Sequence, residues 1–151
     1  VHDQMMAQGR GHIVNLSSIY GNFPNAGAGV YTATKAAVNI LSETLRVESQ
    51  GRIKVTIVKP TGVPATNLGS TVVNGEAIVG ILGAHFGDFM EQAIHYASGT
   101  LPPEKTDPDH PQYWTIEPDQ LAEQIVYVIN QPWGVSISDI TVRATGEQYI
   151  L

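Results

Sequence analysis

Residues 17–37 read SSIYGNFPNAGAGVYTATKAA. The apolar, β-branched run HIVNLSS leads into this stretch and predicts a buried strand over 12–17. Gly, Asn and Pro in IYGNFPNAGAG predict a loop. Apolar residues at steps of three and four then predict a helix over about 28–48. A strand that ends in a small-residue loop and passes directly into a long helix is typical of an α/β fold.

The same alternation continues on both sides of this stretch. Residues 1–8 contain no Gly or Pro and predict a helix end, which the following GRG interrupts. RIKVTIVKP at 52–60 predicts a second strand, Pro118 suits the first turn of a helix, and a third strand is expected around 137–143. Strands that alternate with helices predict right-handed crossovers and therefore an α/β fold with a parallel sheet.

Composition excludes several classes of function. The 151 residues are enough for one domain at most, and the net charge is −6 with the eight Lys and Arg residues scattered singly, which argues against nucleic acid and anionic membrane surfaces as partners. No apolar run approaches the roughly 20 residues of a membrane span. The absence of Cys excludes disulfides and thiolate metal sites, fits a reducing compartment and favours a cytoplasmic protein. His85 and His95 lack a third ligand at metal-binding spacing, so no metal site is predicted.

Tyr31 and Lys35 are the candidate reactive pair. At about 100° per residue they lie about 40° apart on the predicted helix, at the rim of the apolar stripe that consists of Val30, Ala33, Ala37, Ile40, Leu41, Thr44 and Leu45. A phenol has a pKa near 10, and a neighbouring ammonium lowers the pKa of a phenol because it stabilises the phenolate. Such a tyrosine can exchange a proton with a substrate oxygen, and Ser18 at the strand end could hydrogen-bond the same oxygen.

The pair by itself is a weak signal, because an exposed Tyr–Lys pair on a helix is common. The residues around the pair strengthen its interpretation as a reactive site. Ser18 ends a predicted strand shortly before Tyr31, and ligands bind at the carboxyl edge of parallel sheets. A further interpretation is a generic flavodoxin-like binding domain. The spacing of Ser18, Tyr31 and Lys35 disfavours it, because binding alone would not require this spacing.

GHIVNLSSIYG and VYTATKAAVNILSETLRVE resemble the active-site half of the short-chain dehydrogenase/reductase family. The resemblance implies that Ser18 orients the substrate oxygen, that Tyr31 is the acid/base, and that Lys35 also holds the ribose of an NAD or NADP cofactor. Ser17 is expected to have no direct role. The implied fold is a Rossmann-like doubly wound parallel sheet, of which this sequence contains only the C-terminal half, about three strands with flanking helices, as one partial domain over 1–151.

The run PTGVPAT after the second predicted strand departs from the family pattern. Pro60 and Val63 match, Thr61 replaces a Gly, and the family threonine falls one place late at Thr66. The resemblance implies cofactor contacts at Pro60, Gly62 and Val63, with Thr66 the weakest candidate. The glycine-rich phosphate loop of the family does not occur in this sequence, and GNFPNAGAG does not replace it because it does not lie between a first strand and its helix.

In the family, the interval at about 64–117 forms a substrate lid. Residues 72–98 predict two short helices divided near Gly87, followed by a polar, Pro-rich excursion. Several large apolar residues favour a roomy, partly apolar pocket, although each of them could instead simply pack the lid: Ile78, Ile81, Leu82, Phe86, Phe89, Tyr96 and Trp114. Tyr20, close to Ser18, is a further candidate for substrate binding.

The sequence therefore predicts an NAD(P)(H)-dependent oxidoreductase that interconverts a secondary alcohol and a carbonyl compound. We interpret the chain as a fragment without the dinucleotide-binding N-terminal half, inactive alone. The alternative is a non-catalytic truncated module that acts only in assembly with a complete subunit. Because the helices at 1–8 and 28–48 usually form a subunit interface in the family, the complete protein is expected to be a homodimer or homotetramer. The edge of the strand at 12–17 is expected to be exposed in this chain.

Overall fold

The computed structural model describes residues 1–149, which form three parallel strands flanked by helices. The strands β1 (Gly11–Leu16), β2 (Ile53–Pro60) and β3 (Asp139–Val142) lie in the order β1-β2-β3. In the register, Gly11 lies opposite Ile53, and Ile57 lies opposite Asp139. The predicted α/β class and parallel sheet are confirmed, and each strand lies within a few residues of its predicted position.

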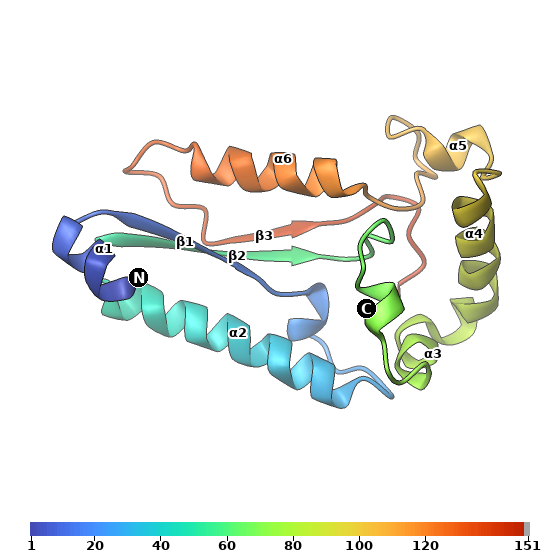
Figure 1. Cartoon of the computed structure of the whole chain (residues 1–151), viewed down its shortest axis with the longest axis horizontal. Coiled ribbons are helices and arrows are strands. Elements are labelled where there is room, and N and C mark those ends of the chain that lie inside the picture. Colours follow the sequence, from blue (N-terminus) through green and yellow to red (C-terminus); the bar gives the residue numbers. More distant parts are fainter. Residues whose placement is uncertain (150–151) are drawn as a thin grey trace.

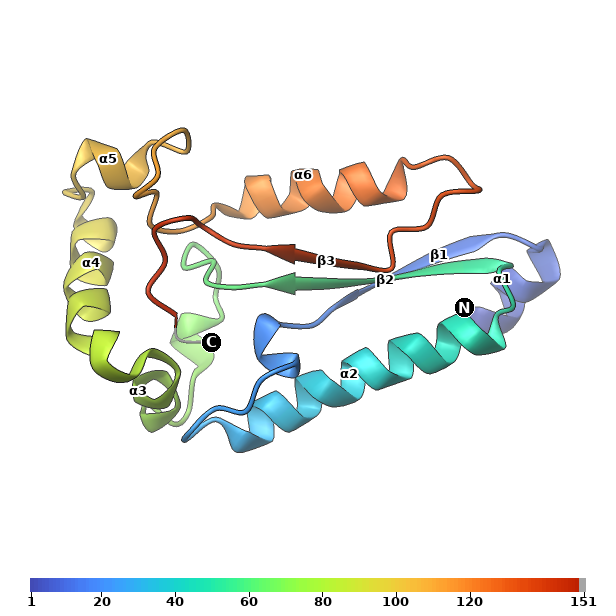
Figure 2. The same ribbon diagram turned by 180° about the vertical axis from the view of Figure 1, so that it is seen from behind.

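The central strand β2 forms the core of the sheet. Its side chains are buried from Ile53 to Lys59, as expected for a parallel strand covered on both faces. Helix α2 (Gly29–Glu48) covers one face and α6 (Pro118–Ile129) covers the other (Figure 1). Figure 2 shows the same two layers from behind. Strand β1, by contrast, has only β2 as a neighbour in the described sheet, and Leu16 at its end is 53% exposed.

Helix ends follow from local chemistry. Helix α1 (His2–Gln8) stops at Gly9, which takes a left-handed conformation with φ 67°. Helix α6 begins with Pro118 in its first turn and with a capping box between Glu117 and Gln120. The Gln120 side chain accepts a hydrogen bond of 2.8 Å from the Glu117 backbone N–H.

The face of α2 that meets the sheet is polar, which the sequence pattern did not predict. Asn39 and Ser42 are the buried residues of this helix, and Asn15 Nδ2 donates a 2.8 Å hydrogen bond to Ser42 Oγ. The predicted apolar stripe faces outward instead, since Ile40 and Leu41 are each 67% exposed. Periodicity reveals that an apolar stripe exists but not what covers it, and in this chain the stripe lies on the side of α2 away from the sheet.

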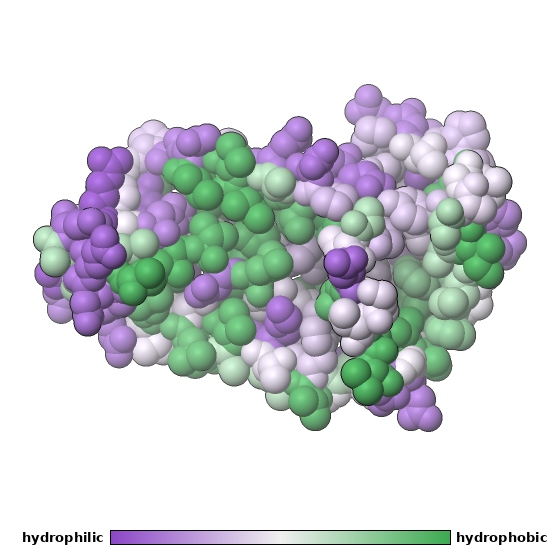
Figure 3. Space-filling view, viewed as in Figure 1, coloured by the Kyte–Doolittle hydropathy of each residue, from purple (hydrophilic) through white to green (hydrophobic). Residues whose placement is uncertain are grey.

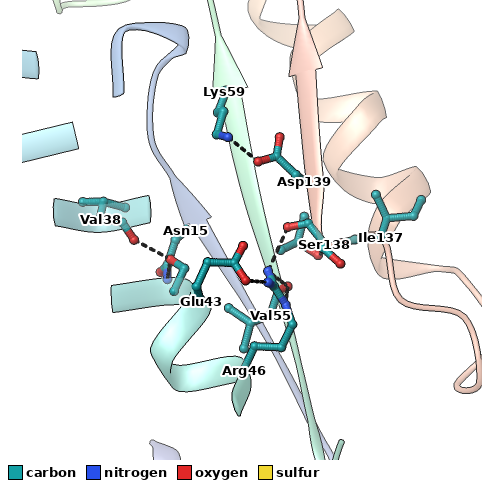
Figure 4. Close-up of polar contacts among 11 residues, drawn as sticks. Asn15, Val38, Glu43, Arg46, Val55, Lys59, Ile137, Ser138 and Asp139 are labelled. Atoms are coloured by element: carbon teal, nitrogen blue, oxygen red, sulfur yellow. Dashed lines mark hydrogen bonds and ion pairs between the residues drawn. The ribbon is translucent and has the colours of Figure 1, made fainter. Parts of the chain in front are cut away.

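Arg46 joins α2 to the sheet at the opposite end from the strand carboxyl ends. Its Nη2 donates to Val55 O at 2.9 Å and to Ser138 O at 3.0 Å, and its guanidinium also pairs with Glu43 (Figure 4). Lys59 pairs with Asp139 across β2 and β3. These contacts tie the short strand β3 to the rest of the sheet.

The interval predicted to form a lid contains three short helices, called the lid helices below: α3 (Glu76–Leu82), α4 (Phe86–Ser98) and α5 (Pro103–Thr106). They lie together at one end of the sheet (Figure 1). The two predicted short helices are present, but they divide a few residues before the predicted point near Gly87. The chain breaks at Gly83, whose φ of 51° and ψ of −124° only glycine adopts readily, whereas Gly87 lies in the first turn of α4. Within residues 1–149, no helix combines the length and apolar character that crossing a membrane requires.

Hydrophobic side chains gather on the face drawn in Figure 3, along β1 and between α2 and α6. Leu16 contributes to the exposed apolar surface at the strand edge, and Val126 of α6 is 55% exposed. An uncovered parallel edge strand is unusual, because its free backbone groups and apolar side chains favour association. The exposed edge predicted for this strand is therefore present.

His12 is expected to make stability depend on pH. The Thr56 hydroxyl donates to Ile137 O at 2.6 Å and lies 2.8 Å from His12 Nε2, so the neutral ring donates to Thr56. Burial, and secondly the Lys54 ammonium, lower the pKa of His12 below its usual 6.5. The unfolded chain then binds more protons, so the free energy of unfolding should fall as pH drops from 6.5 through the lowered pKa.

A His12→Gln variant tests this expectation. Denaturant titrations of the full-length protein from pH 7.5 to 5 should show a smaller loss of unfolding free energy in the variant. The slope of that free energy against pH should decrease by the equivalent of at most about one bound proton. An unchanged pH slope in this variant would contradict this role for His12.

Candidate active site

One cavity of about 1170 Å³ opens at the carboxyl ends of the strands, where parallel sheets bind ligands. Each strand leads into its wall: Ser18 follows β1, Thr61 follows β2, and Tyr149 lies beyond β3. Tyr31, in the first turns of α2, and residues of α3 and α4 complete the enclosure. The fold thereby brings together residues far apart in the sequence.

The two neighbouring serines point in different directions. Ser17 Oγ donates to Lys35 O at 3.2 Å, so its hydroxyl is used in packing β1 against α2. Ser18 lines the cavity, and its Oγ accepts a 3.2 Å hydrogen bond from the Tyr20 N–H. Ser18 has an extended backbone with φ −158° and ψ 157°, and successive side chains of an extended chain alternate in direction. The structure thus presents the Ser18 hydroxyl, and not that of Ser17, to a ligand.

Tyr31 and Lys35 lie on the sheet-facing side of α2, together with Asn39 and Ser42. Tyr31 lines the cavity, while Lys35 stands outside the lining with its Nζ 5.9 Å from the centroid of the Tyr31 ring. Lys35 Nζ also donates to Leu16 O at 3.2 Å, which holds the ammonium at the end of β1. The predicted rim position is corrected, because these residues belong to the face that packs on the sheet.

The segment after β2 presents Thr61, Gly62 and Val63 to the cavity, whereas Pro60 ends the strand outside the lining. Thr115 Oγ1 donates to Gly62 O at 3.0 Å, which fixes this turn. The Thr61 hydroxyl oxygen is buried and has no hydrogen-bond partner in the described part of the chain. Thr66 is exposed and bonds to Val63 O at 2.8 Å, so it lies away from the cavity.

Tyr20 and Tyr149 form an aromatic wall of the cavity. Their rings meet edge to face with centroids 6.3 Å apart, and the Tyr149 ring also lies 5.9 Å from Phe89. Burial raises the pKa of Tyr20 to about 12, with a further contribution from the Glu147 carboxylate. Burial also raises the pKa of Tyr149. Both phenols are therefore neutral at physiological pH.

Tyr149 is a site residue that the sequence interpretation missed. The only available signal was an aromatic residue shortly after the last strand, and no periodicity or motif connects it to the others. Its hydroxyl lies against Gly62, where a Cβ would overlap it. A side chain at position 62 would therefore displace the Tyr149 ring from this position.

The predicted apolar pocket is present. Trp114 lies 5.4 Å from Phe89 and 5.7 Å from Tyr96, measured between ring centroids. Of the apolar residues singled out from the sequence, all but Phe86 line the cavity: Ile78, Ile81, Leu82, Phe89, Tyr96 and Trp114. The part of the chain that the structure describes holds no group of three or more His, Cys, Asp or Glu arranged for a metal ion.

Comparison with known proteins agrees with this architecture. The sequence profile of the family described as short chain dehydrogenase matches residues 1–77, more than half of the chain. A probable NADP-dependent dehydrogenase of Haemophilus influenzae is 27% identical over 146 residues, which cover 96% of this chain and 48% of that protein. The glycine betaine reductase ATRR of Emericella nidulans is 30% identical over 144 residues, 95% of this chain but only 9% of that much longer protein.

Solved structures show the same fold. A 7α-hydroxysteroid dehydrogenase complexed with NADH and 7-oxo glycochenodeoxycholic acid superposes with a TM-score of 0.64 at 20% identity, covering 98% of this chain and 49% of that one. The closed form of a serine dehydrogenase complexed with NADP⁺ gives a TM-score of 0.63 at 24% identity, with 93% and 46% covered.

The chain belongs to the short chain dehydrogenase family. Its Rossmann-like α/β fold corresponds to about half of each of these solved structures. It likewise spans about half the length of the bacterial oxidoreductases that it matches.

Proposed function

We propose that this chain is the C-terminal, reacting half of an NAD(P)(H)-dependent oxidoreductase that interconverts a secondary alcohol and a carbonyl compound. The observation that carries the proposal is that Ser18 and Tyr31 line the same cavity, with the Lys35 ammonium 5.9 Å from the centroid of the Tyr31 ring. The length of the matched relatives supports the view that a further part of the domain belongs to the functional protein.

The roles of the three residues follow from their chemistry. In carbonyl reduction, Ser18 Oγ donates a hydrogen bond to the carbonyl oxygen and orients it. Tyr31 transfers its hydroxyl proton to the same oxygen, so that the carbonyl becomes an alcohol. Lys35 places a positive charge beside the phenol, which stabilises the oxygen that has given up its proton. In alcohol oxidation each of these proton movements is reversed.

The residues of this chain fit the nicotinamide end of a dinucleotide. When bound, NAD(P)H supplies the hydride that adds to the carbonyl carbon. The partnerless Thr61 hydroxyl in the cavity wall offers a hydrogen bond to an amide group, and Gly62 and Val63 lie beside it. We propose that these residues contact the nicotinamide, and that Tyr31 and Lys35 hold the ribose. Both NAD and NADP remain candidates for the complete protein.

Substitution of the two adjacent serines tests the proposal with a matched control. Ser18→Ala in the full-length protein should reduce kcat/KM for carbonyl substrates by about 10²-fold, since it removes a hydrogen bond to the reacting oxygen. Ser17→Ala makes the same change one residue away and should leave kcat/KM within about threefold, because Ser17 bonds to α2. The measurement is the rate of NAD(P)H oxidation at 340 nm. Equal losses in both variants would contradict the assignment of Ser18.

We also propose that the complete protein forms a homodimer or homotetramer through the outer face of α2. This face carries Ile40 and Leu41, each 67% exposed, and Val47, which is 76% exposed. Exposed apolar side chains in a row on a helix mark an association surface. The sheet-facing side of the same helix is already occupied, so the outer face is the one available to a partner.

A further inference from the structure

The cavity wall carries no charged side chain among the residues that the structure describes. Its polar groups are hydroxyls, the Trp114 indole and the Asn74 amide, and the rest of the lining is aliphatic, aromatic, glycine or the Met90 thioether. An ionised group that leaves water for such a site loses its hydration without gaining a counter-charge, which is costly. The lining therefore disfavours acids, ammonium compounds and zwitterions as substrates.

Two carboxylates close to wall residues, Glu117 and Glu147, make contacts within the chain. Glu117 accepts hydrogen bonds of 2.9 and 3.2 Å from Tyr96 Oη and caps α6. Glu147 pairs with Arg143 through Oε1, and its Oε2 is buried without a hydrogen-bond partner in the described part of the chain, so that only 4% of the side chain is exposed. Lys35 bonds to Leu16 O behind the Tyr31 ring. None of these groups is placed to neutralise a charged substrate body.

The aromatic rings form one continuous wall rather than a cage around a point. The chain of contacts runs from Tyr96 through Trp114 and Phe89 to Tyr149 and Tyr20, with centroid separations of 5.7, 5.4, 5.9 and 6.3 Å. Ring faces and edges that pack against each other this way present a broad apolar surface. This surface extends from lid helix α4 to the strand ends where the reacting groups lie.

The cavity is large for this chemistry. Its volume of about 1170 Å³ exceeds the roughly 300–1,000 Å³ of most small-molecule sites. A nicotinamide ring beside Gly62 and Val63 would use only part of this space. The remainder, between the reacting residues and the lid, suits a substrate with an apolar ring system rather than one of a few atoms.

Tyr149 bounds the cavity next to the reacting end, and the C-terminal segment that carries it is anchored. Gly146 N donates to Tyr113 O at 2.8 Å, and Trp114 Nε1 donates to Gln148 Oε1 at 3.2 Å. The Tyr149 hydroxyl lies against Gly62, with its ring between Tyr20 and Phe89. The ring therefore occupies space that a bulkier substrate would need near the reacting carbon.

We propose that the cavity accepts an uncharged alcohol or ketone with an apolar, ring-sized body, and that the Tyr149 ring limits its bulk near the reacting carbon. The reaction assigned to this substrate rests on the proposed function above, whereas its binding does not. Glycine betaine and serine, which appear in the names of two relatives, are zwitterions and lie outside this class.

A matched set of ketones tests the charge preference in the full-length protein. The set consists of 4-methylcyclohexanone, 4-oxocyclohexanecarboxylate and 4-(trimethylammonio)cyclohexanone, which share the reacting ring and differ in charge. We expect kcat/KM for the neutral ketone to exceed that for either ion by at least about 100-fold. Preference for the anion or for the cation would overturn the proposal.

Calorimetry separates this inference from the proposed function. Titration of a Tyr31→Phe variant with the three corresponding alcohols measures binding without turnover, and the neutral alcohol should bind most tightly. If the protein reduces none of the ketones but keeps this order of affinity, the proposed function fails and the substrate class stands. If it reduces the charged ketones as well as the neutral one, the substrate class fails and the reaction stands.

Tyr149→Ala and Tyr149→Phe test the limit on bulk. We expect Tyr149→Ala to raise the ratio of kcat/KM for 2,2-dimethylcyclohexanone to that for cyclohexanone by about 10-fold, because the space beside the reacting carbon opens. Tyr149→Phe keeps the ring and should keep the wild-type ratio. A thermal melt of each variant reports whether the fold is retained. An unchanged ratio in a folded Tyr149→Ala protein would overturn the role of this ring.

Discussion

A Tyr31→Phe variant of the full-length protein is expected to lose about 10²–10⁴-fold in kcat, the range that a positioned general acid or base contributes. The ring stays in the cavity wall, but the hydroxyl that would donate the proton is removed. Hydride transfer without that proton would leave an alkoxide in an apolar site, which is energetically costly. Stopped-flow measurement of NAD(P)H oxidation gives the rate, and fluorescence titration gives the affinity for the cofactor. This affinity should fall far less than kcat, because Lys35 still holds the ribose.

Two controls make the result specific to the site. Tyr127→Phe makes the same chemical change on α6, where the side chain is 56% exposed and outside the cavity, and should leave kcat within about twofold. Lys35→Met should also lower kcat, while Lys35→Arg, which keeps the positive charge, should retain more activity than Lys35→Met. Turnover by Tyr31→Phe close to that of the unmodified protein would exclude Tyr31 as the proton donor.

An Ile40→Glu variant is expected to convert the assembled full-length protein to smaller species at micromolar concentration. The carboxylate would be buried without a partner in the proposed interface on α2, and such burial weakens association by roughly 10²-fold or more. Multi-angle light scattering coupled to size exclusion measures the mass directly. The fold should survive, because Ile40 does not pack on the sheet and is 67% exposed in this chain.

Ile94→Glu is the matched control for association. Ile94 is the same residue type with nearly the same exposure, 66%, but it lies on lid helix α4. Its substitution should leave the mass of the assembly unchanged. A full-sized oligomer in Ile40→Glu, or dissociation in Ile94→Glu alone, would place the interface elsewhere.

Local patterns in the sequence predicted most of the secondary structure. The long helix was placed at 28–48 and is found at Gly29–Glu48, because apolar spacing, a glycine-rich entry and a glycine exit all act within a few residues. The division of the lid was misplaced because Gly83 and Gly87 are equally able to interrupt a helix. Which of the two takes the positive φ depends on how α3 and α4 pack together.

Ser18, Tyr31, Lys35, Gly62 and Val63 were singled out from motifs, and four of them line one cavity with Lys35 beside the Tyr31 ring. Their catalytic and cofactor-binding roles stay predictions. Tyr149 was not predicted as a site residue, because it reaches Gly62 only through the path that the chain takes after β3. No sequence pattern between residues 62 and 149 predicts that contact.

The amino-acid sequence by itself determined the order of strands and helices and the identity of the groups that can exchange a proton, since both depend on side chains within a few positions of one another. Only the tertiary structure decided that the apolar stripe of α2 faces outward and that the polar side with Tyr31, Lys35 and Ser42 meets the sheet. The periodicity of a helix does not show which of its faces packs against another element. That information comes from the β1 and β2 backbone and side-chain groups, which accept and donate the hydrogen bonds of the buried polar face.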